Sequence, residues 1–292
     1  DLPKDSNLGG TLLEVPRLFS DSSFLQEVMS QISSEVLKQY WRDEFLNMSE
    51  FHKSEMMGYF TSKFTPLVTG PQVRNVIGQL RSGFNFKEIM DNKKILLVNL
   101  ASGKIGRRNS ELLGSMFVSR FLWTAMGRAW QSQASRHDFY LYVDEFQNFI
   151  TDSFETILSE ARKYGLNLII AHQHLAQLRA MGRMGDKLER AVFGNVGTMI
   201  AFRTGPDATA LASEFGEPAE PSTIRNLENR YAVVKLLVND VPTVPFTMKT
   251  NDYISPKPHE LERGKRIREH SLKKHGRLLA EVDQEVRKRY SG

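Results

Sequence analysis

The residues best placed to do chemistry in this sequence are two adjacent carboxylates, Asp144 and Glu145. They directly follow the apolar and aromatic run FYLYV at 139–143, which has the length of a buried strand. Ligands of open α/β sheets bind at the carboxyl ends of strands, and two buried carboxylates are costly without a cation. In a P-loop ATPase the first acid would hold Mg²⁺, usually through water, and the second would polarise the attacking water. The other interpretation is an acidic strand end that only caps a following helix.

A polar pair, His172 and Gln173, follows the next predicted strand at 166–171. If the two strands are neighbours in a parallel sheet, this pair lies beside the two carboxylates. The amide of Gln173 could then hold the attacking water or sense the γ-phosphate of a nucleotide. Alternatively, Gln173 caps the next helix, and its position alone does not decide between the two roles.

A helix is predicted between these strands, over 151–164. Asp152 and Glu155 have the spacing of a capping box, apolar residues recur at helical intervals, and Gly165 ends the helix. Arg162 lies in the last turn, roughly 15 Å from the helix end nearest the carboxylates at about 1.5 Å per residue. It either complements the helix dipole or serves a neighbouring subunit's site as an arginine finger. Only the second role requires an oligomer.

Short apolar runs and longer amphipathic stretches alternate in the central part of the chain. The apolar runs have the length of strands and lie at 93–101, 138–146, 166–173, 196–204 and 231–238. Stretches long enough for helices separate the first four runs, at 108–132, 151–164 and 174–192. Near-continuous apolar strands that alternate with helices predict a mostly parallel sheet covered on both faces. The predicted fold class is α/β, with a core of the mononucleotide-binding kind.

We expect three regions along the chain. Residues 1–92 carry apolar side chains at helical spacing, with breaks at Pro66 and Gly70, and form a helical subdomain. Residues 93–254 form the α/β core, and residues 255–292 form a basic helical tail. From Lys257 onward the tail has eleven basic and six acidic residues, an excess of five that equals the formal charge of the whole chain. It is either a solvated tail or a non-specific contact to an acidic partner such as nucleic acid.

Composition describes an ordinary globular protein of 292 residues, 40% hydrophobic and 25% charged. The sequence has no cysteine, which excludes disulfides and thiolate metal sites and fits a cytoplasmic location. Its seven scattered histidines predict no metal site built from protein ligands alone. No apolar run is long enough to span a membrane, and the start DLPKDSNLGG has no signal-peptide pattern. Because the first residue is Asp rather than Met, we expect a piece of a longer protein, in which a membrane segment further upstream stays open.

The order of these motifs resembles a known family. The run YLYVDEFQNFITDSFETILSEARKYGLNLIIAHQHLAQL and the later GNVGTMIAFRTGPDATALASEFG resemble the TraG/TraD-like coupling proteins of conjugative type IV secretion. These belong to the wider HerA/FtsK class of DNA-pumping ATPases. TLLEVPRLFSDSSFLQEVM and ILLVNLASGKIG are similar to the family too, so the resemblance covers most of the chain. The combined order of DE, ARKYG, AHQ and FRTG is more specific than any single motif.

The resemblance implies a RecA-like P-loop ATPase core with a helical subdomain between the phosphate loop and the acidic strand. It implies a homohexamer at the inner face of the cell membrane, which uses ATP and Mg²⁺ to move DNA, bound to a relaxase, toward a secretion channel. Carried over by position, Asp144 and Glu145 match the Mg²⁺ and catalytic pair, Gln173 the sensor glutamine and Arg162 the arginine finger. Arg203, in the FRTG motif, is a weaker candidate for a nucleotide or subunit contact, and a structural salt bridge is its other interpretation.

One part of the family pattern is missing. A phosphate loop needs GxxxxGK[ST], because backbone amides wrap the phosphates while Lys and a hydroxyl reach phosphate and Mg²⁺. The lookalike at 102–105, SGKI, has Val98 in place of the first Gly and Ile105 in place of Ser or Thr. We expect the loop and a membrane anchor upstream. The alternatives are a docking module that lost its phosphate loop, and a HerA- or FtsK-like pump for repair or segregation.

Overall fold

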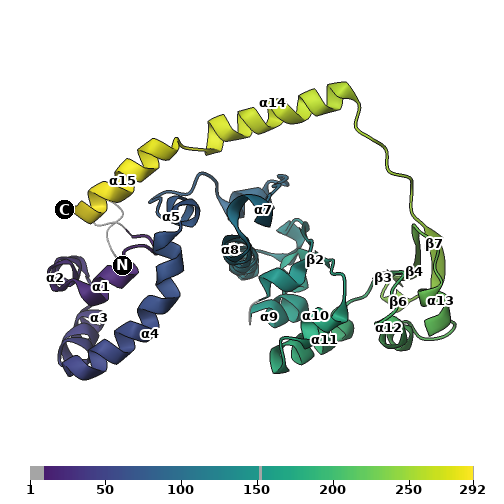
Figure 1. Cartoon of the computed structure of the whole chain (residues 1–292), viewed down its shortest axis with the longest axis horizontal. Helices are drawn as coiled ribbons and strands as arrows, with labels where there is room; N and C mark the ends of the chain where they lie inside the picture. Colours follow the sequence, from purple (N-terminus) through teal and green to yellow (C-terminus); the bar gives the residue numbers. More distant parts are fainter. Residues whose placement is uncertain (1–9, 151–152, 292) are drawn as a thin grey trace. The chain divides into compact units, whose positions relative to one another are not determined.

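A computed structural model of the chain describes residues 10–150 and 153–291 (Figure 1). These residues form two compact units. Unit 1 contains residues 10–85, 101–109 and 262–291, and unit 2 contains residues 86–100 and 110–261. Each unit has buried apolar clusters of its own. In neither unit do the described residues form a helix long and apolar enough to cross a bilayer.

Unit 1 is helical in the residues that the structure describes. Its elements are α1 Val15–Ser20, α2 Ser22–Gln31, α3 Glu35–Tyr40, a π-helical turn Trp41–Leu46, α4 Glu50–Thr69, α5 Pro71–Ile77, α7 Ser102–Ile105, α14 Pro258–His275 except for its first turn, and α15 Leu279–Ser291. Asp21 caps α2, because its carboxylate accepts hydrogen bonds from the backbone N–H groups of Ser23 and Phe24. Helix α4 runs through Pro66 and ends before Gly70, so the break predicted at Pro66 is wrong and the one at Gly70 is confirmed.

The last helix, α15, packs onto the first helices of unit 1. Val282 and Val286 are buried together with Leu13. The side chains of Arg289 and Glu14 are almost fully buried, and Arg289 Nε lies 3.0 Å from Glu14 Oε1. Such a pair is destabilising to break, because removal of one partner leaves a buried charge. Helix α15 is therefore a structural part of unit 1 rather than a solvated tail.

Unit 2 contains every strand that the structure describes. Its helices are α6 Phe86–Asp91, α8 Arg107–Met126 from Ser110 onward, α9 Ser153–Glu160, α10 Leu175–Arg179, α11 Arg183–Asn195, α12 Ala208–Phe215 and α13 Pro221–Arg225. Its strands are β1 Phe139–Val143, β2 Leu166–Ile170, β3 Met199–Phe202, β4 Tyr231–Lys235, β5 Leu237–Val238, β6 Val241–Pro242 and β7 Phe246–Lys249. Short 3₁₀ turns lie at Gly127–Trp130, Gln133–Ser135, Phe146–Phe149 and Ala161–Tyr164. The predicted α/β class is confirmed.

The parallel sheet is narrower than the sequence predicted. Strands β1 and β2 are parallel, with Phe139 opposite Leu166 and Val143 opposite Ile170. Strands β3, β4 and β7 form a separate antiparallel sheet, and β5 pairs with β6. The apolar run 93–101 has the composition of a strand. It does not form one, because no described segment pairs with it. The prediction of a parallel strand is therefore wrong for this run and for β3 and β4.

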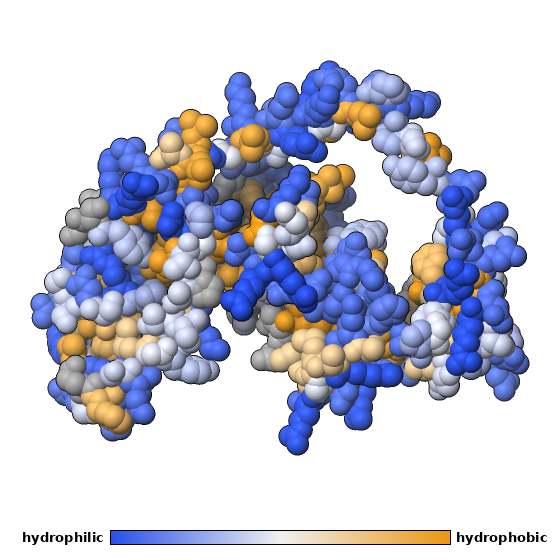
Figure 2. Space-filling model, in the orientation of Figure 1, coloured by the Kyte–Doolittle hydropathy of each residue, from blue (hydrophilic) through white to orange (hydrophobic). Residues whose placement is uncertain are grey.

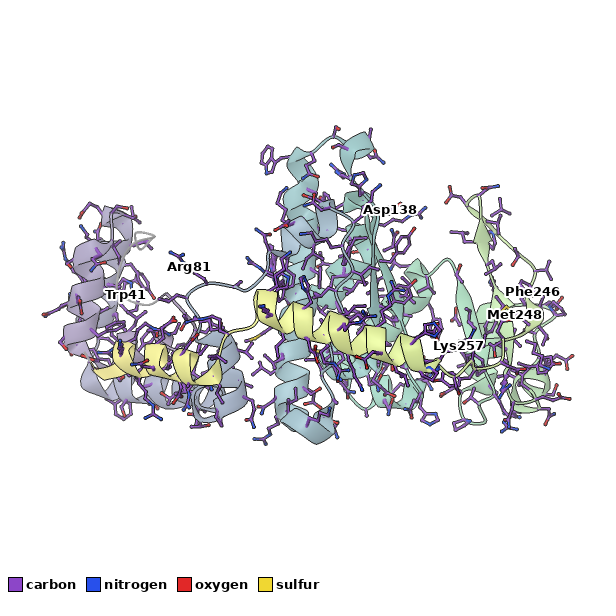
Figure 3. All side chains as sticks on the ribbon, turned by 90° about the horizontal axis from the view of Figure 1, so that it is seen from above. Trp41, Arg81, Asp138, Phe246, Met248 and Lys257 are labelled. Carbon is purple, nitrogen blue, oxygen red and sulfur yellow. The ribbon has the colours of Figure 1, made fainter. Side chains whose placement is uncertain are left out.

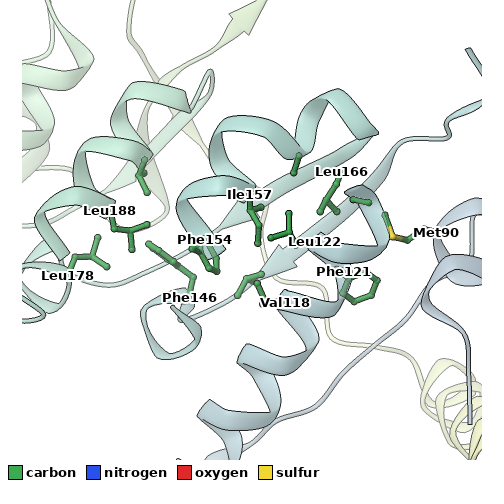
Figure 4. Packing of buried hydrophobic residues seen from close by; sticks show 14 of the residues in the cluster. Met90, Val118, Phe121, Leu122, Phe146, Phe154, Ile157, Leu166, Leu178 and Leu188 are labelled. Carbon is green, nitrogen blue, oxygen red and sulfur yellow. The ribbon is translucent and has the colours of Figure 1, made fainter. Parts of the chain in front are cut away.

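One face of the parallel pair is covered by the main apolar cluster of unit 2 (Figure 4). Phe146, Phe154 and Ile157 are fully or almost fully buried in it, so the inward face predicted for the helix between the strands is confirmed. On the other face of β1, Tyr140 and Tyr142 are 56% and 73% exposed. Among the described residues, helices therefore cover this sheet on one face only, whereas the sequence predicted cover on both faces.

A buried arginine joins three elements at the amino-terminal edge of the parallel pair. The Arg128 side chain is fully buried, and its Nε donates to Asp91 Oδ1 at 3.0 Å. Its Nη1 donates to the backbone carbonyls of His137 at 3.0 Å and Tyr164 at 3.1 Å. Burial alone would raise the pKa of Asp91, but a hydrogen bond from Lys87 and the charge of Arg128 outweigh this and lower it. The guanidinium thus ties α6 to the segments that lead into β1 and β2.

Candidate functional site

The two parallel strands of unit 2 stay paired beyond their ends. Ala171 N donates to Val143 O at 3.0 Å, and Phe146 N donates to Ala171 O at 3.1 Å. Between these bonds, Glu145 adopts a left-handed backbone conformation with φ 50°. A residue other than glycine is strained there, and such strain is concentrated at functional sites. The turn directs the acidic pair to the carboxyl-terminal edge of the sheet.

Two side-chain amides hold the carboxylate of Glu145. Gln173 Nε2 donates to Glu145 Oε1, and Gln147 Nε2 donates to Glu145 Oε2 at 2.5 Å. The prediction that Gln173 lies beside the acidic pair is confirmed. Gln147 is a neighbour that the sequence analysis missed, and its only signal was a polar residue two positions after Glu145 in DEFQN.

Gln173 does not cap the next helix. The backbone N–H of Leu175, at the start of α10, donates instead to the buried carboxylate of Asp207 at 3.0 Å. A carboxylate from a distant part of unit 2 therefore satisfies this helix end. The amide of Gln173 donates to Glu145 instead. A role in holding the attacking water or sensing the γ-phosphate requires this position.

Asp144 is exposed, and its Oδ1 accepts a hydrogen bond from the backbone N–H of Glu145 at 3.0 Å. In residues 10–150 and 153–291 no group of three or more His, Cys, Asp or Glu side chains could hold a metal ion. Mg²⁺ does not require such a group, because it keeps several waters and takes one or two carboxylates together with phosphate oxygens. Of the two carboxylates at this edge, that of Asp144 accepts no hydrogen bond from a side-chain amide of the described residues, and it could be such a ligand when a nucleotide supplies the phosphates.

His172 lies next to the amide and carboxylate. Its ring meets the Phe146 ring edge to face, with centroids 5.3 Å apart. Burial lowers the pKa of His172, although the backbone of His174 and the charge of Asp207 act in the opposite direction. Its buried Nδ1 has no hydrogen-bond partner among the described residues. Burial therefore disfavours the charged form of this imidazole beside the site.

The two arginines from the sequence analysis lie away from the acidic pair. Arg162 is in the 3₁₀ turn that precedes β2, at the opposite end of that strand from Gln173. Its Nη2 lies 3.4 Å from Asp240 Oδ1, and its side chain is 76% exposed. Arg203 follows β3 in the antiparallel sheet and donates to the side-chain oxygen of Asn229 at 3.2 Å. An intrasubunit contact of Arg162 with the site is thus excluded by topology, as predicted.

Asp152 and Glu155, predicted as a capping box, cannot be compared with the structure. Asp152 and the side chain of Glu155 lie outside the part of the chain that the structure describes. The other end of this helix follows the prediction. Gly165 adopts the left-handed conformation with φ 71° and ends the 3₁₀ turn. Its backbone N–H donates a hydrogen bond to Arg162 O at 3.0 Å.

Comparisons with known proteins agree on this region and on the fold. Residues 138–230 match a family model described as the TraM recognition site of TraD and TraG. The bacterial conjugative coupling protein TrwBdeltaN70, in an unbound monoclinic form, matches with TM-score 0.54 and 12% identity over 81% of this chain and 58% of that chain. The plasmid coupling protein TrwB in complex with the non-hydrolisable ATP analogue ADPNP matches with TM-score 0.51 and 12% identity over 84% and 63%.

A curated relative is similar at the level of sequence. An uncharacterized protein of Mycoplasma pneumoniae (strain ATCC 29342 / M129 / Subtype 1) is 24% identical over 95 residues, which are 32% of this chain and 62% of that protein. This chain thus spans 58% to 63% of the length of the proteins it matches.

The chain has the mixed α/β, RecA-like fold of the conjugative coupling protein structures. Residues 138–230, which contain Glu145, Gln147 and Gln173, are the part of the chain that matches the TraD and TraG family model. The chain is TraG/TraD-like, and the resemblance seen in its sequence is confirmed.

Proposed function

We propose that this chain is the carboxyl-terminal part of a coupling protein that hydrolyses ATP to move DNA in conjugative type IV secretion. The observation that carries the proposal is the hydrogen bond from Gln173 to Glu145 at the joint end of two parallel strands. The similar structures support it, since one is a conjugative coupling protein and another holds an ATP analogue.

Each side chain of the site has a role in hydrolysis. Glu145 polarises the attacking water, and the amide of Gln173 orients that water while it holds the carboxylate. Gln147 fixes the second oxygen of Glu145, so the carboxylate cannot rotate freely. Asp144 holds Mg²⁺ through water, and the ion neutralises charge on the phosphate oxygens when it is bound.

Arg162 acts on the site of a neighbouring subunit. Its guanidinium is exposed and has only a surface ion pair with Asp240, an interaction typically worth less than about 1 kcal/mol. It is thus free to exchange Asp240 for the γ-phosphate of a nucleotide bound to the next protomer. This role requires a ring of subunits, and a homohexamer is the assembly we propose. Arg203 is a second, weaker candidate for such a subunit contact.

The proposal needs parts that residues 1–292 do not contain. The sequence has no GxxxxGK[ST], so a phosphate loop has to come from outside these residues. A membrane anchor, if the protein has one, has to come from there too, and it would place this chain at the inner face of the membrane. Proposed partners are a relaxase bound to DNA, the secretion channel, and a TraM-like protein that recognises residues 138–230.

The test is ATP hydrolysis by the full-length protein, with Mg²⁺, in the presence and absence of DNA. We expect hydrolysis that depends on Mg²⁺ and increases with DNA. A folded full-length protein that neither binds nor hydrolyses ATP would contradict the proposal and favour a docking module that lost its phosphate loop.

A further inference from the structure

The basic residues near the carboxyl terminus fall into two structural groups. Three of the four around α15 have carboxylate partners: Arg277 with Glu285 at 2.6 Å, Arg287 with Asp283 at 2.8 Å, and Arg289 with Glu14 at 3.0 Å. Their charge is compensated within unit 1. Helix α15 therefore contributes less positive field than its sequence indicates.

The basic residues of α14 are not compensated in this way. They are Arg263, Lys265, Arg266, Arg268, Lys273 and Lys274, against Glu260, Glu262 and Glu269. Lys265 lies 3.7 Å from Glu262, but in the part of the chain that the structure describes the other five have no carboxylate partner. All residues of α14 are exposed. This helix thus carries an excess of three positive charges in full contact with solvent.

The cations of α14 lie on two opposite sides of the helix. At about 100° per residue, Arg263, Arg266, Lys273 and Lys274 fall on one side, and Lys265 and Arg268 fall on the opposite side. The apolar residues are likewise scattered: Leu261 and Leu272 lie on one side and Ile267 on another. The space-filling view shows the helix as hydrophilic, with isolated hydrophobic residues (Figure 2). A helix that binds a membrane surface needs a continuous apolar face, and α14 has none.

Helix α14 is held at its end. His275 Nδ1 lies within hydrogen-bond distance of Gly83 O, at 2.8 Å, and a Cβ on Gly83 would clash with the backbone carbonyl of His275. Helix α15, which follows directly, is fixed by the buried pair of Arg289 and Glu14. Figure 3 draws the side chains of the described residues and labels Lys257, which directly precedes α14. Unit 1 therefore presents a cationic helix whose side chains are free to bind.

We propose that α14 holds the nucleic acid through its phosphate backbone. The inference deepens the proposed function, because it rests on DNA being the substrate and assigns the contact to one helix. Guanidinium and ammonium groups pair with phosphate oxygens without reading bases, which suits a protein that moves along DNA of any sequence. Phosphates on a flexible or helical strand meet cations on both sides of α14, whereas a flat anionic surface would meet only one.

The test compares two double variants of the full-length protein with equal loss of charge. One is Arg266→Gln with Lys273→Gln, on one side of α14. The control is Arg277→Gln with Arg287→Gln around α15, where both side chains have carboxylate partners. Glutamine keeps a high helix propensity, and circular dichroism confirms that the helices persist. Binding of a fluorescently labelled, random-sequence DNA is measured without nucleotide over a series of salt concentrations. Vesicles of phosphatidylserine and phosphatidylcholine serve as a second probe.

The α14 variant is expected to lower the slope of log K against log salt by about 1.4 to 1.8, since each phosphate contact contributes about 0.7 to 0.9. The α15 variant is expected to leave it nearly unchanged. Equal slopes for all three proteins, equal losses in both variants, or loss of vesicle binding with unchanged DNA binding would each overturn the inference. Because no hydrolysis is involved, failure here is distinct from an absence of ATPase activity in the wild type.

Discussion

Gln173 and Glu145 are 28 positions apart in the sequence, yet the amide of one donates a hydrogen bond to the carboxylate of the other. The contact exists because β1 and β2 are parallel neighbours that end together, with α9 as the crossover between them. A parallel connection of this kind brings successive strand ends to one edge of the sheet. The site is thus a product of topology: its neighbours in sequence are Asp144 and Gln147, and Gln173 comes from the next strand end.

The first prediction concerns Gln147. Its substitution by methionine keeps the volume but removes the hydrogen bond to Glu145 Oε2, so the carboxylate gains freedom. We expect kcat for ATP to fall about tenfold or more in the full-length protein, because a hydrogen bond to a charged group contributes about 1.5 to 3 kcal/mol. KM should change little. Gln177→Met, at an exposed position of α10, is the control, and an unchanged kcat in the Gln147 variant would remove the positioning role.

A second prediction concerns the buried guanidinium of Arg128. Replacement by methionine leaves Asp91 partly buried and two backbone carbonyls without their donor. The expected loss is about 3 to 5 kcal/mol in the free energy of unfolding, measured by urea denaturation. Arg120→Met, at an exposed position of α8, the helix that precedes the turn with Arg128, should cost less than about 0.5 kcal/mol. Equal stabilities of the two variants would show that Arg128 is not essential to unit 2.

Gln173 and Arg128 illustrate what a sequence can and cannot predict. The strands around Asp144 and Gln173, the helix between them and the end at Gly165 follow from local periodicity and capping, so they were predictable. The proximity of Gln173 to Glu145 followed from the assumption of neighbouring parallel strands. The partners of Arg128 were not predictable, because its contacts lie 9, 36 and 37 positions away and no spacing rule connects them.

The strand predicted at 93–101 shows the opposite error. Its composition suits a strand, but a strand needs a partner for its backbone groups, and the described residues provide none. Ile95 and Leu97 are 89% and 88% exposed. Periodicity reports which side chains suit burial; it does not report whether a neighbouring strand exists. The same reason explains β3, which pairs with β4 in a separate antiparallel sheet.

A third prediction concerns pH. Hydrogen bonds from the hydroxyl of Ser23 and the backbone of Phe24 lower the pKa of Asp21 from 3.8 to about 2. Because the folded pKa is lowered, the cap stabilises unit 1 above pH 3.8, and this contribution is lost as the pH falls toward 2. Asp21→Asn keeps a capping oxygen that does not titrate. Thermal unfolding should show wild type losing its advantage over this variant across that range; a constant difference would contradict the assigned cap.

A fourth prediction tests the role of Arg162 between subunits. Arg162→Ala should lower turnover of the full-length protein by on the order of 10³-fold or more if it is a trans arginine finger. Asp240→Asn removes only the surface partner of Arg162 and should leave turnover nearly intact. Mixing Arg162→Ala with Glu145→Gln subunits should partly restore activity, because some interfaces regain both groups. Turnover in the mixture equal to that of the separate variants would exclude a shared site.

The most direct test of the central claim is a single substitution, Glu145→Gln, in the full-length protein. Nucleotide affinity and steady-state ATP hydrolysis are measured on the same preparation, with circular dichroism as the check on folding. If Glu145 polarises the attacking water, turnover falls by at least about 10²-fold while ATP still binds. Wild-type turnover in the folded variant would contradict the assignment of this edge of the sheet as the hydrolytic site.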